Sequence, residues 1–234
     1  MTIVPISREA ILANHFLLRH LRPEELKHLA VNSTITRHSS GSTIYQKGDA
    51  GDSLMAVLHG RVKICTFSLA GKELILNIID RGGLFGEIAV LDGRPRSADA
   101  VAIGEIELLV LERRRLMPFL TGDPTIAARL IAVLCQRLRQ TSELAEDALL
   151  RDAPSRLARC LLRLSSTLGV RDGPGLKLNI KLSQQQIGNL IGMSRESTNR
   201  CIVEWTRAGY LSVTNGFIRI DDPEALKDMS EAEV

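Results

Sequence analysis

Short apolar runs separated by glycines dominate the first half of the chain. From about Ser33 to Leu116 the apolar runs cover residues 62–64, 74–79, 88–91, 98–103 and 106–111. Between them glycines recur every eleven residues, at Gly60, Gly71, Gly82, Gly93 and Gly104. This pattern is typical of short antiparallel strands joined by tight turns. We expect a small β-sandwich, roll or barrel here, preceded by two short helices over Arg8–Leu29 that Arg22-Pro23 separates.

A long helix is predicted next, and its apolar positions form a regular seam. Asp123-Pro124 suits a helix start, and no further Gly or Pro occurs before Pro154. Seam positions alternate at spacings of four and three: Ala127, Ile131, Leu134, Leu138, Thr141, Ala145 and Ala148. Such a seam predicts that two helices pair across a twofold axis. Burial of the helix within one monomer is the alternative, and a second stripe (Ile126, Leu130, Val133) is predicted to pack on the β domain.

The prolines and glycines after this helix suggest where the chain divides. Asp152-Ala153-Pro154 is predicted to end the helix and to mark a hinge. Arg156–Leu168 then reads as an amphipathic helix, and Gly169–Gly175 as a loop. We therefore expect a β domain over residues 1–122, a dimerisation helix and hinge over 123–153, and a third domain over 154–234.

The strongest local pattern lies at residues 182–200 and predicts two short helices joined by a tight turn. Ser183, with Gln186 three residues later, forms a capping box at the first helix start. Gly188 is small where a second helix must cross closely, and Gly192 can adopt the positive φ of the turn. Ser194 is placed to cap the second helix.

Polar side chains gather at the exposed start of that second helix. In a helix-turn-helix this end enters the DNA major groove, where Arg can bond guanine and Glu can accept from cytosine. The stretch from Lys177 to Arg219 holds six basic and two acidic residues, which favours phosphate contact. A plain helical hairpin with a charged surface is the alternative. The candidate DNA-contacting residues are Ser183, Gln184, Ser194, Arg195, Glu196, Ser197, Asn199 and Arg200.

Two further segments complete the predicted sites. Tyr210–Val213 and Phe217–Ile220 flank Asn215-Gly216, which predicts a β-hairpin wing after the second helix. In the β half, Phe85–Leu91 is followed by Arg94–Ser97. Backbone amides near Gly86 and the guanidinium of Arg96 suit a cyclic phosphate, and Glu87 can accept from a ribose hydroxyl. An ion pair that closes a β turn explains the same residues without a ligand.

The order of these parts resembles the cyclic-AMP receptor and fumarate/nitrate regulator (Crp/Fnr) family over about residues 10–222. The block Gly192–Arg200 is similar to the family's GxSRExxxR recognition motif, and Phe85–Ser97 to its FGE…RS phosphate-binding cassette. Thr198 and Cys201 depart from the family, since larger aliphatic residues are common there. The resemblance implies an α+β protein with an N-terminal β-roll (a double-stranded β-helix), a long dimerisation helix and a C-terminal winged helix-turn-helix.

The same resemblance implies ligands and partners. A cyclic nucleotide, cyclic AMP before cyclic GMP, is the expected effector, and Arg195, Glu196 and Arg200 are expected to read a TGTGA-like half-site. Regulation without a nucleotide, or by another small effector, stays open. Thr141 and Ser142 resemble residues that meet the adenine, although one polar seam residue can equally set helix register. The candidate nucleotide-binding residues are Gly86, Glu87, Ile88, Ala89, Arg96, Ser97, Thr141 and Ser142.

Composition narrows the remaining function classes. Aromatic residues make up 3% of the chain, which disfavours a surface that stacks single-stranded bases. Four dispersed cysteines form no CxxC pair, so no metal, haem or iron–sulfur cofactor is expected. No nucleotide-hydrolase, Ser/His/Asp or HExxH motif occurs, and we expect no catalytic residues.

The N-terminus and the lengths of the apolar runs bear on where the protein is located in the cell. No cleavable signal and no apolar run of ~18 residues is present, so a cytoplasmic protein without membrane contact is expected. The expected partners are double-stranded DNA, a second copy of the chain and RNA polymerase. The sequence leaves target genes, and activation versus repression, open.

Overall fold

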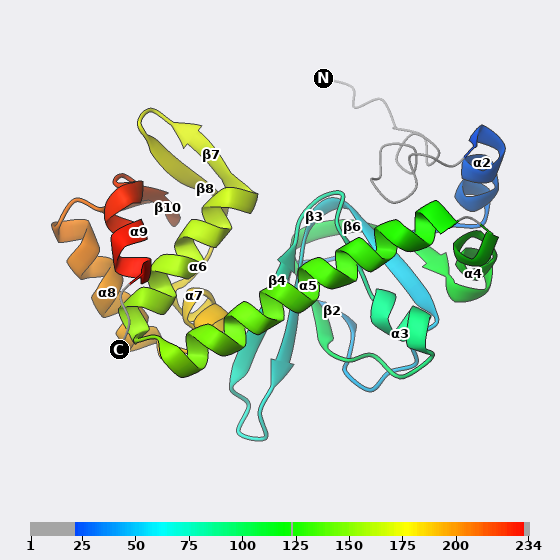
Figure 1. The fold of residues 1–234 in the computed structure, drawn as a ribbon, viewed down its shortest axis with the longest axis horizontal. Helices are drawn as coiled ribbons and strands as arrows, with labels where there is room; N and C mark the ends of the chain where they lie inside the picture. Colours follow the sequence, from blue (N-terminus) through cyan, green and yellow to red (C-terminus); the bar gives the residue numbers. More distant parts are fainter. Residues whose placement is uncertain (1–21, 123, 232–234) are drawn as a thin grey trace. The chain divides into compact units, whose positions relative to one another are not determined.

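The computed structural model describes residues 22–122 and 124–231 and divides them into two compact units. The first unit holds the described residues up to Thr66 together with Asn77–Leu138, and the second holds Phe67–Leu76 together with the residues from Arg139 onward. Strands dominate the first unit and helices the second (Figure 1). The α+β class, with a β-rich first part, a long helix and a helix-turn-helix, is confirmed.

One antiparallel sheet organises the first part of the chain. β6 pairs with β1, β2 and β3, while β5 and β4 pair with β3, so the path runs β1-β6-β3-β4. The predicted helix after Arg22 is present, whereas the one before it lies outside the described residues. The elements are α2 (Pro23–Val31), β1 (Thr34–His38), β2 (Thr43–Tyr45), β3 (Ser53–Phe67), β4 (Glu73–Ile79), β5 (Leu84–Phe85), α3 (Glu87–Asp92), β6 (Asp99–Glu112), α4 (Arg113–Gly122) and α5 (Pro124–Leu150).

The prediction of a turn at every eleventh glycine is wrong at two positions. Gly60 lies inside β3 and Gly104 inside β6, each with a positive φ, and the β3–β6 register shifts around Gly60. A Cβ on Gly60 would lie 2.4 Å from the Glu105 carbonyl oxygen, so a close backbone approach requires glycine there. The apolar run Ile88–Leu91 is also not a strand, because it forms most of α3.

Helix α5 carries two different apolar faces. Ile126 and Leu130 are buried in a core cluster with Leu54 and Leu116, which confirms that these two residues of the second stripe pack on the β domain. The third, Val133, is half-buried. On the seam, Leu138 has 67% of its surface exposed. Ile131 is similarly exposed, so burial of this seam within one chain is wrong.

The second unit is built on a helix that begins earlier than predicted. Helix α5 ends at Leu150, and α6 starts at Ala153 with Asp152 as its cap and Pro154 inside its first turn. The prediction of a loop over Gly169–Gly175 is wrong, because the segment holds all of β7 and the first residue of β8, which pair with each other. The final helix was not predicted. The elements are α6 (Ala153–Leu168), β7 (Gly169–Asp172), β8 (Gly175–Lys181), α7 (Gln184–Ile191), α8 (Arg195–Arg207), β9 (Leu211–Thr214), β10 (Phe217–Ile220) and α9 (Pro223–Glu231).

The four thiols differ sharply in exposure. Cys65, Cys160 and Cys201 are buried, whereas Cys135 on α5 is exposed, and none forms a disulfide. Burial raises the pKa of the Cys160 thiol to about 11, and burial also raises the pKa of Cys201. These two thiols stay protonated and behave as small apolar side chains.

Candidate functional site

The guanidinium of Arg96 is the centre of the candidate anion site. Its Nη1 donates to the Gly86 carbonyl oxygen at 2.9 Å, and its Nη2 to Ser53 Oγ at 3.0 Å. The ring of Tyr45 lies against it, with 4.3 Å from the guanidinium carbon to the ring centre. Arg96 is 4% exposed. The guanidinium of Arg96 is therefore buried, and the two groups that accept its hydrogen bonds are neutral.

Gly86 makes this approach possible. Its φ is 81°, in the left-handed region that favours glycine, and it precedes α3 without a side-chain cap. A Cβ at this position would lie 2.6 Å from Nη1 of Arg96. The sequence therefore needs glycine at this point to seat the arginine and to start the short helix.

Glu87, the next residue, is paired with a residue that the sequence analysis missed. Its Oε1 lies 2.8 Å from Nη1 of Arg137 on α5, and Arg137 also donates to the Leu84 carbonyl oxygen. Glu87 is 1% exposed, and neither of its oxygens has a well-aligned hydrogen-bond donor. The pair joins α3 to α5.

These side chains surround a small cavity. Its lining includes six of the eight predicted nucleotide-binding residues: Gly86, Glu87, Ile88, Ala89, Arg96 and Ser97. Tyr45, Ile64, Ala98 and Arg137 complete it, and burial raises the pKa of the Tyr45 hydroxyl to about 12. The free space is about 40 Å³. Thr141 and Ser142 are exposed one turn beyond Arg137 and do not line this cavity.

The residues at this cavity fit an anionic ligand with a hydroxyl group. Nε of Arg96 is buried and lacks a hydrogen-bond partner. Burying an unpaired charge is costly, so an anion beside Arg96 would relieve that cost. Glu87 supplies acceptor oxygens that a sugar hydroxyl could satisfy. The arrangement therefore matches a sugar phosphate better than it matches an apolar ligand.

The second candidate site is the helix pair α7–α8. The capping box between Ser183 and Gln186 is present, and Ser194 caps α8 through the Ser197 amide, as predicted. A Cβ on Gly188 would lie 2.8 Å from the Met193 carbonyl oxygen, which confirms the close helix crossing. Gly192 has a φ of 71° in the turn. Local caps and glycines thus fix the geometry of this pair.

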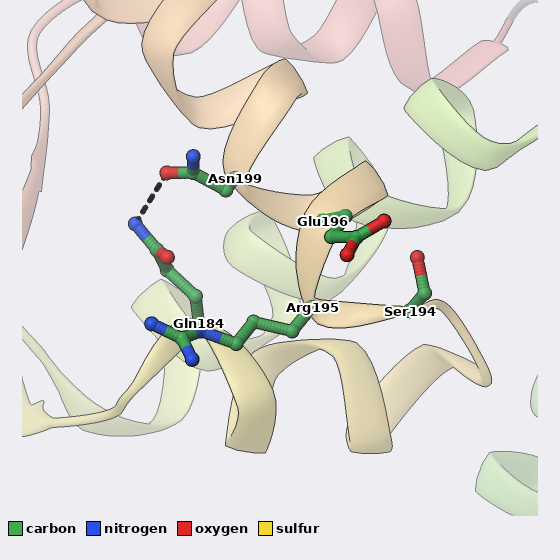
Figure 2. A pocket seen from close by; sticks show the side chains of 5 residues that line it. All are labelled: Gln184, Ser194, Arg195, Glu196 and Asn199. Carbon is green, nitrogen blue, oxygen red and sulfur yellow. Dashed lines mark hydrogen bonds between the residues drawn. The ribbon is translucent and has the colours of Figure 1, made fainter.

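The start of α8 presents polar side chains around a surface hollow. Figure 2 shows Arg195, Glu196 and Ser194 there, with Gln184 of α7 facing Asn199 of α8. Gln184 Nε2 donates to Asn199 Oδ1 at 2.6 Å. Arg195, Glu196, Asn199 and Arg200 are exposed, and Ser197 is half-buried. Thr198 and Cys201, the two departures from the family pattern, are buried among the helices. Exposed donors and acceptors at one helix start can reach base edges in a groove.

The strands beyond α8 form the predicted wing. β9 and β10 pair around Asn215 and Gly216, both with positive φ, in a sheet of order β7-β8-β10-β9. The ammonium groups of Lys177 and Lys181 both lie about 5 Å from the ring centre of Phe217. Two cations are thus held beside the wing, where they can contact phosphate.

Metal-ion sites and membrane spans are two further features that bear on function. Across residues 22–122 and 124–231, no three His, Cys, Asp or Glu side chains gather as a metal site would need. No single helix in this described part is both long and apolar enough to cross a membrane, and α4 and α5 reach that criterion only jointly, as a bent pair.

Two known protein domains match successive parts of the chain. Residues 35–123 match the cyclic nucleotide-binding domain, and residues 155–229 the Crp-like helix-turn-helix domain. The "Cyclic AMP receptor protein" of Thermus thermophilus is 32% identical over 216 residues, 92% of this chain and 96% of that protein. A "CRP-like cAMP-activated global transcriptional regulator" of Mycobacterium tuberculosis is 29% identical over 218 residues, 93% of this chain and 97% of that protein.

A solved structure supports the fold. FixK2 from Bradyrhizobium japonicum superposes with a TM-score of 0.78 at 20% identity, covering 86% of this chain and 99% of that one. Because both domains match and the Thermus thermophilus relative is 32% identical over 92% of this chain, the chain belongs to the Crp/Fnr family of cyclic-nucleotide-binding, helix-turn-helix transcription regulators.

Proposed function

We propose that the chain is a cyclic-AMP-responsive dimer that binds a TGTGA-like palindrome in the DNA major groove. The observation that carries the nucleotide assignment is the buried Arg96, whose hydrogen-bond acceptors are a carbonyl and a hydroxyl. A cyclic phosphate would bring a negative charge and further acceptor oxygens to this guanidinium. Glu87 would accept from the ribose, and Gly86, Ile88, Ala89 and Ser97 would line the phosphate. The names of the relatives favour cyclic AMP over cyclic GMP.

The narrow cavity makes binding depend on a rearrangement. Ligand pockets usually measure roughly 300–1,000 Å³, whereas this one offers about 40 Å³. A nucleotide would therefore need the lining to open, and Arg137, which now lies beside Glu87 and Leu84, is the lining residue that we propose moves. Because Arg137 is part of α5, the ligand would favour one arrangement of this helix over another. In this state Thr141 and Ser142, the latter from the partner chain, would meet the adenine.

Dimerisation is supported by the exposed seam of α5. Ile131 and Leu138 present large apolar side chains to solvent at heptad positions, and a second copy would cover them. A dimer holds two α8 helices, so it can bind two half-sites about one helical turn apart. Arg195, Glu196 and Arg200 would read bases, while Ser183, Gln184, Ser194, Ser197 and Asn199 would position α8 on the backbone. RNA polymerase is the further partner we propose.

The same narrow cavity favours a second candidate, a regulator of this fold that needs no cyclic nucleotide. Two measurements separate these two candidate functions. Titration calorimetry measures the binding of cyclic AMP and of cyclic GMP to the protein. Binding to a TGTGA palindrome is then measured without a nucleotide, with cyclic AMP and with cyclic GMP. We expect cyclic AMP to bind and to tighten DNA binding. DNA binding of equal strength in all three conditions would instead establish the nucleotide-independent regulator.

The variant Arg96→Ala tests the assignment of the pocket. It removes the charged partner of the phosphate, so we expect at least a tenfold loss of cyclic-AMP affinity with the dimer intact in sedimentation. Arg94→Ala is the matched control, because Arg94 is an exposed arginine two residues away that does not line the cavity. Unchanged affinity in Arg96→Ala would refute the pocket.

A further inference from the structure

A buried acid lies at the junction between α5 and α6. Asp147, on the last turn of α5, is 6% exposed. Its Oδ1 is 2.9 Å from Nε of Arg159 on α6 and 3.4 Å from Nε of Arg151 in the two-residue linker. Arg151 Nη1 in turn donates to the Ser230 carbonyl oxygen of α9 at 2.9 Å. One carboxylate thus connects two helices and their linker, and the chain of contacts continues to a third helix.

This network fixes the angle between α5 and α6 more than it adds to the free energy of unfolding. Replacing a buried ion pair by apolar residues of similar volume is often neutral or stabilising, so such a network need not exist for stability alone. Removing one partner, however, leaves an uncompensated buried charge. The contact with Arg151 continues the last turn of α5, whereas the contact with Arg159 crosses to α6, so a change in the angle between α5 and α6 breaks the contact with Arg159. The network therefore favours one angle.

The angle matters because α6 carries the reading helices. Helix α6 contacts α7, α8, β8 and α9 within the same compact unit, so these elements move with it. The cap of α6, Asp152, accepts from the Ser155 amide inside the same helix start, so this hydrogen bond does not reach α5. Asp147 reaches across the junction.

We propose that Asp147 is a positioning residue that sets, through Arg159 and Arg151, the angle between the stem helix and the DNA-reading helices, and thereby the half-site spacing that the dimer accepts. This inference rests on the proposed function as a dimer on palindromic DNA. A rigid junction penalises sites with the wrong spacing, whereas a loose junction tolerates them.

The test compares full-length protein and Asp147→Asn on two DNA duplexes with saturating cyclic AMP. One duplex is the palindrome selected from random DNA by the native protein, and the other carries one additional central base pair. Asparagine keeps the size of the side chain and removes the charge. We expect the native protein to prefer the selected spacing by tenfold or more, and Asp147→Asn to lose most of this preference with unchanged cyclic-AMP affinity.

Two further variants separate positioning from stability. Glu146→Gln removes an exposed acid one residue earlier, and we expect it to keep the full spacing preference. Arg159→Gln removes the other end of the 2.9 Å contact, so it should reproduce the loss, and Asp147→Asn/Arg159→Gln should lose no more than either single change. The inference stands on Arg159→Gln if Asp147→Asn does not fold.

The outcomes distinguish the two proposals. If the native protein selects no palindrome, the proposed function fails. If the native protein discriminates between spacings and the variants discriminate equally well, the positioning role is overturned. A purely structural role would weaken binding to both duplexes and to a single half-site by the same factor, with the preference unchanged, and that result would also overturn the inference.

Discussion

Arg137 of α5 and Glu87 of α3 form an ion pair, with 2.8 Å between Nη1 and Oε1. This pair links the helix that borders the anion site to the helix that carries the exposed seam. A ligand that competes for either partner acts on both helices at once. A ligand can shift an equilibrium only through a difference in affinity between two states, and this pair is one place where that difference can arise.

Breaking the Glu87–Arg137 pair should destabilise the β-rich unit. Arg137→Gln leaves the carboxylate of Glu87 buried without a counter-charge. We expect a loss of about 3 kcal/mol, the low end for a broken buried pair, because Arg137 keeps some contact with water. Circular dichroism during unfolding in urea measures this loss of free energy of unfolding. The double variant Glu87→Gln/Arg137→Gln should recover part of the lost stability. The control Arg139→Gln, which changes an exposed neighbour, should leave the free energy of unfolding unchanged. Additive effects of the two single changes would contradict the coupling.

Arg195→Ala tests base recognition by the start of α8. Losing one bidentate arginine contact to guanine should cost about 1–3 kcal/mol, or roughly 5- to 150-fold in affinity. Fluorescence anisotropy on the palindrome and on a version with that G·C pair replaced measures both affinity and discrimination. Arg114→Ala, which removes an exposed arginine from the first unit, should leave both unaffected. If Arg195→Ala weakens both duplexes equally, Arg195 contacts phosphate rather than a base.

Gly188→Ala tests the helix crossing. The added methyl group would lie 2.8 Å from the Met193 carbonyl oxygen and 2.9 Å from Thr198 Oγ1. Such overpacking should cost about 1–3 kcal/mol. The single tryptophan, Trp205 of α8, is buried, so its fluorescence in urea reports the stability of this unit. Gly122→Ala, at a position with no heavy atom within 4 Å, is the control. Equal midpoints for both variants would show that α7 and α8 have room to separate.

Asp152→Ala tests the cap of α6 and predicts a pH dependence. The hydrogen bonds from Ser155 hold the pKa of the Asp152 carboxyl below its usual range. Its stabilising contribution is therefore complete above the ordinary Asp pKa and is lost as pH falls through the lowered value. At neutral pH the variant should lose about 1 kcal/mol. Trp205 fluorescence in urea should show the difference shrinking below about pH 4. The surface variant Asp228→Ala should show no such convergence.

Features set by a few neighbouring residues were predictable from the sequence. The capping box at Ser183, the cap at Ser194 and the hairpin at Asn215-Gly216 depend on contacts within four residues, and all three are present. Pro154 shows the limit of local patterns, because proline suits both the end of one helix and the first turn of the next. The structure has the second of these.

Features set by distant residues were harder to predict. Gly60 and Gly104 have the positive φ of turn glycines, yet they lie inside two long strands whose pairing is fixed across the sheet. In the anion site, Arg96 and Glu87 were named from a short motif and do border one cavity. Arg137 lies 50 residues beyond Glu87, and only the docking of α5 on α3 brings them together. Arg137 lies one helical turn before Thr141, and this spacing was the signal in the sequence that could have identified Arg137 as part of the site.

The unequal burial of the thiols has a practical consequence. Cys135 is exposed, while Cys65, Cys160 and Cys201 are enclosed by the fold. A maleimide spin label added to the native protein will therefore attach at one site on the stem helix, with no engineered cysteine. In the proposed dimer, electron paramagnetic resonance between two such labels can then measure how the distance between the two α5 helices changes when cyclic AMP is added.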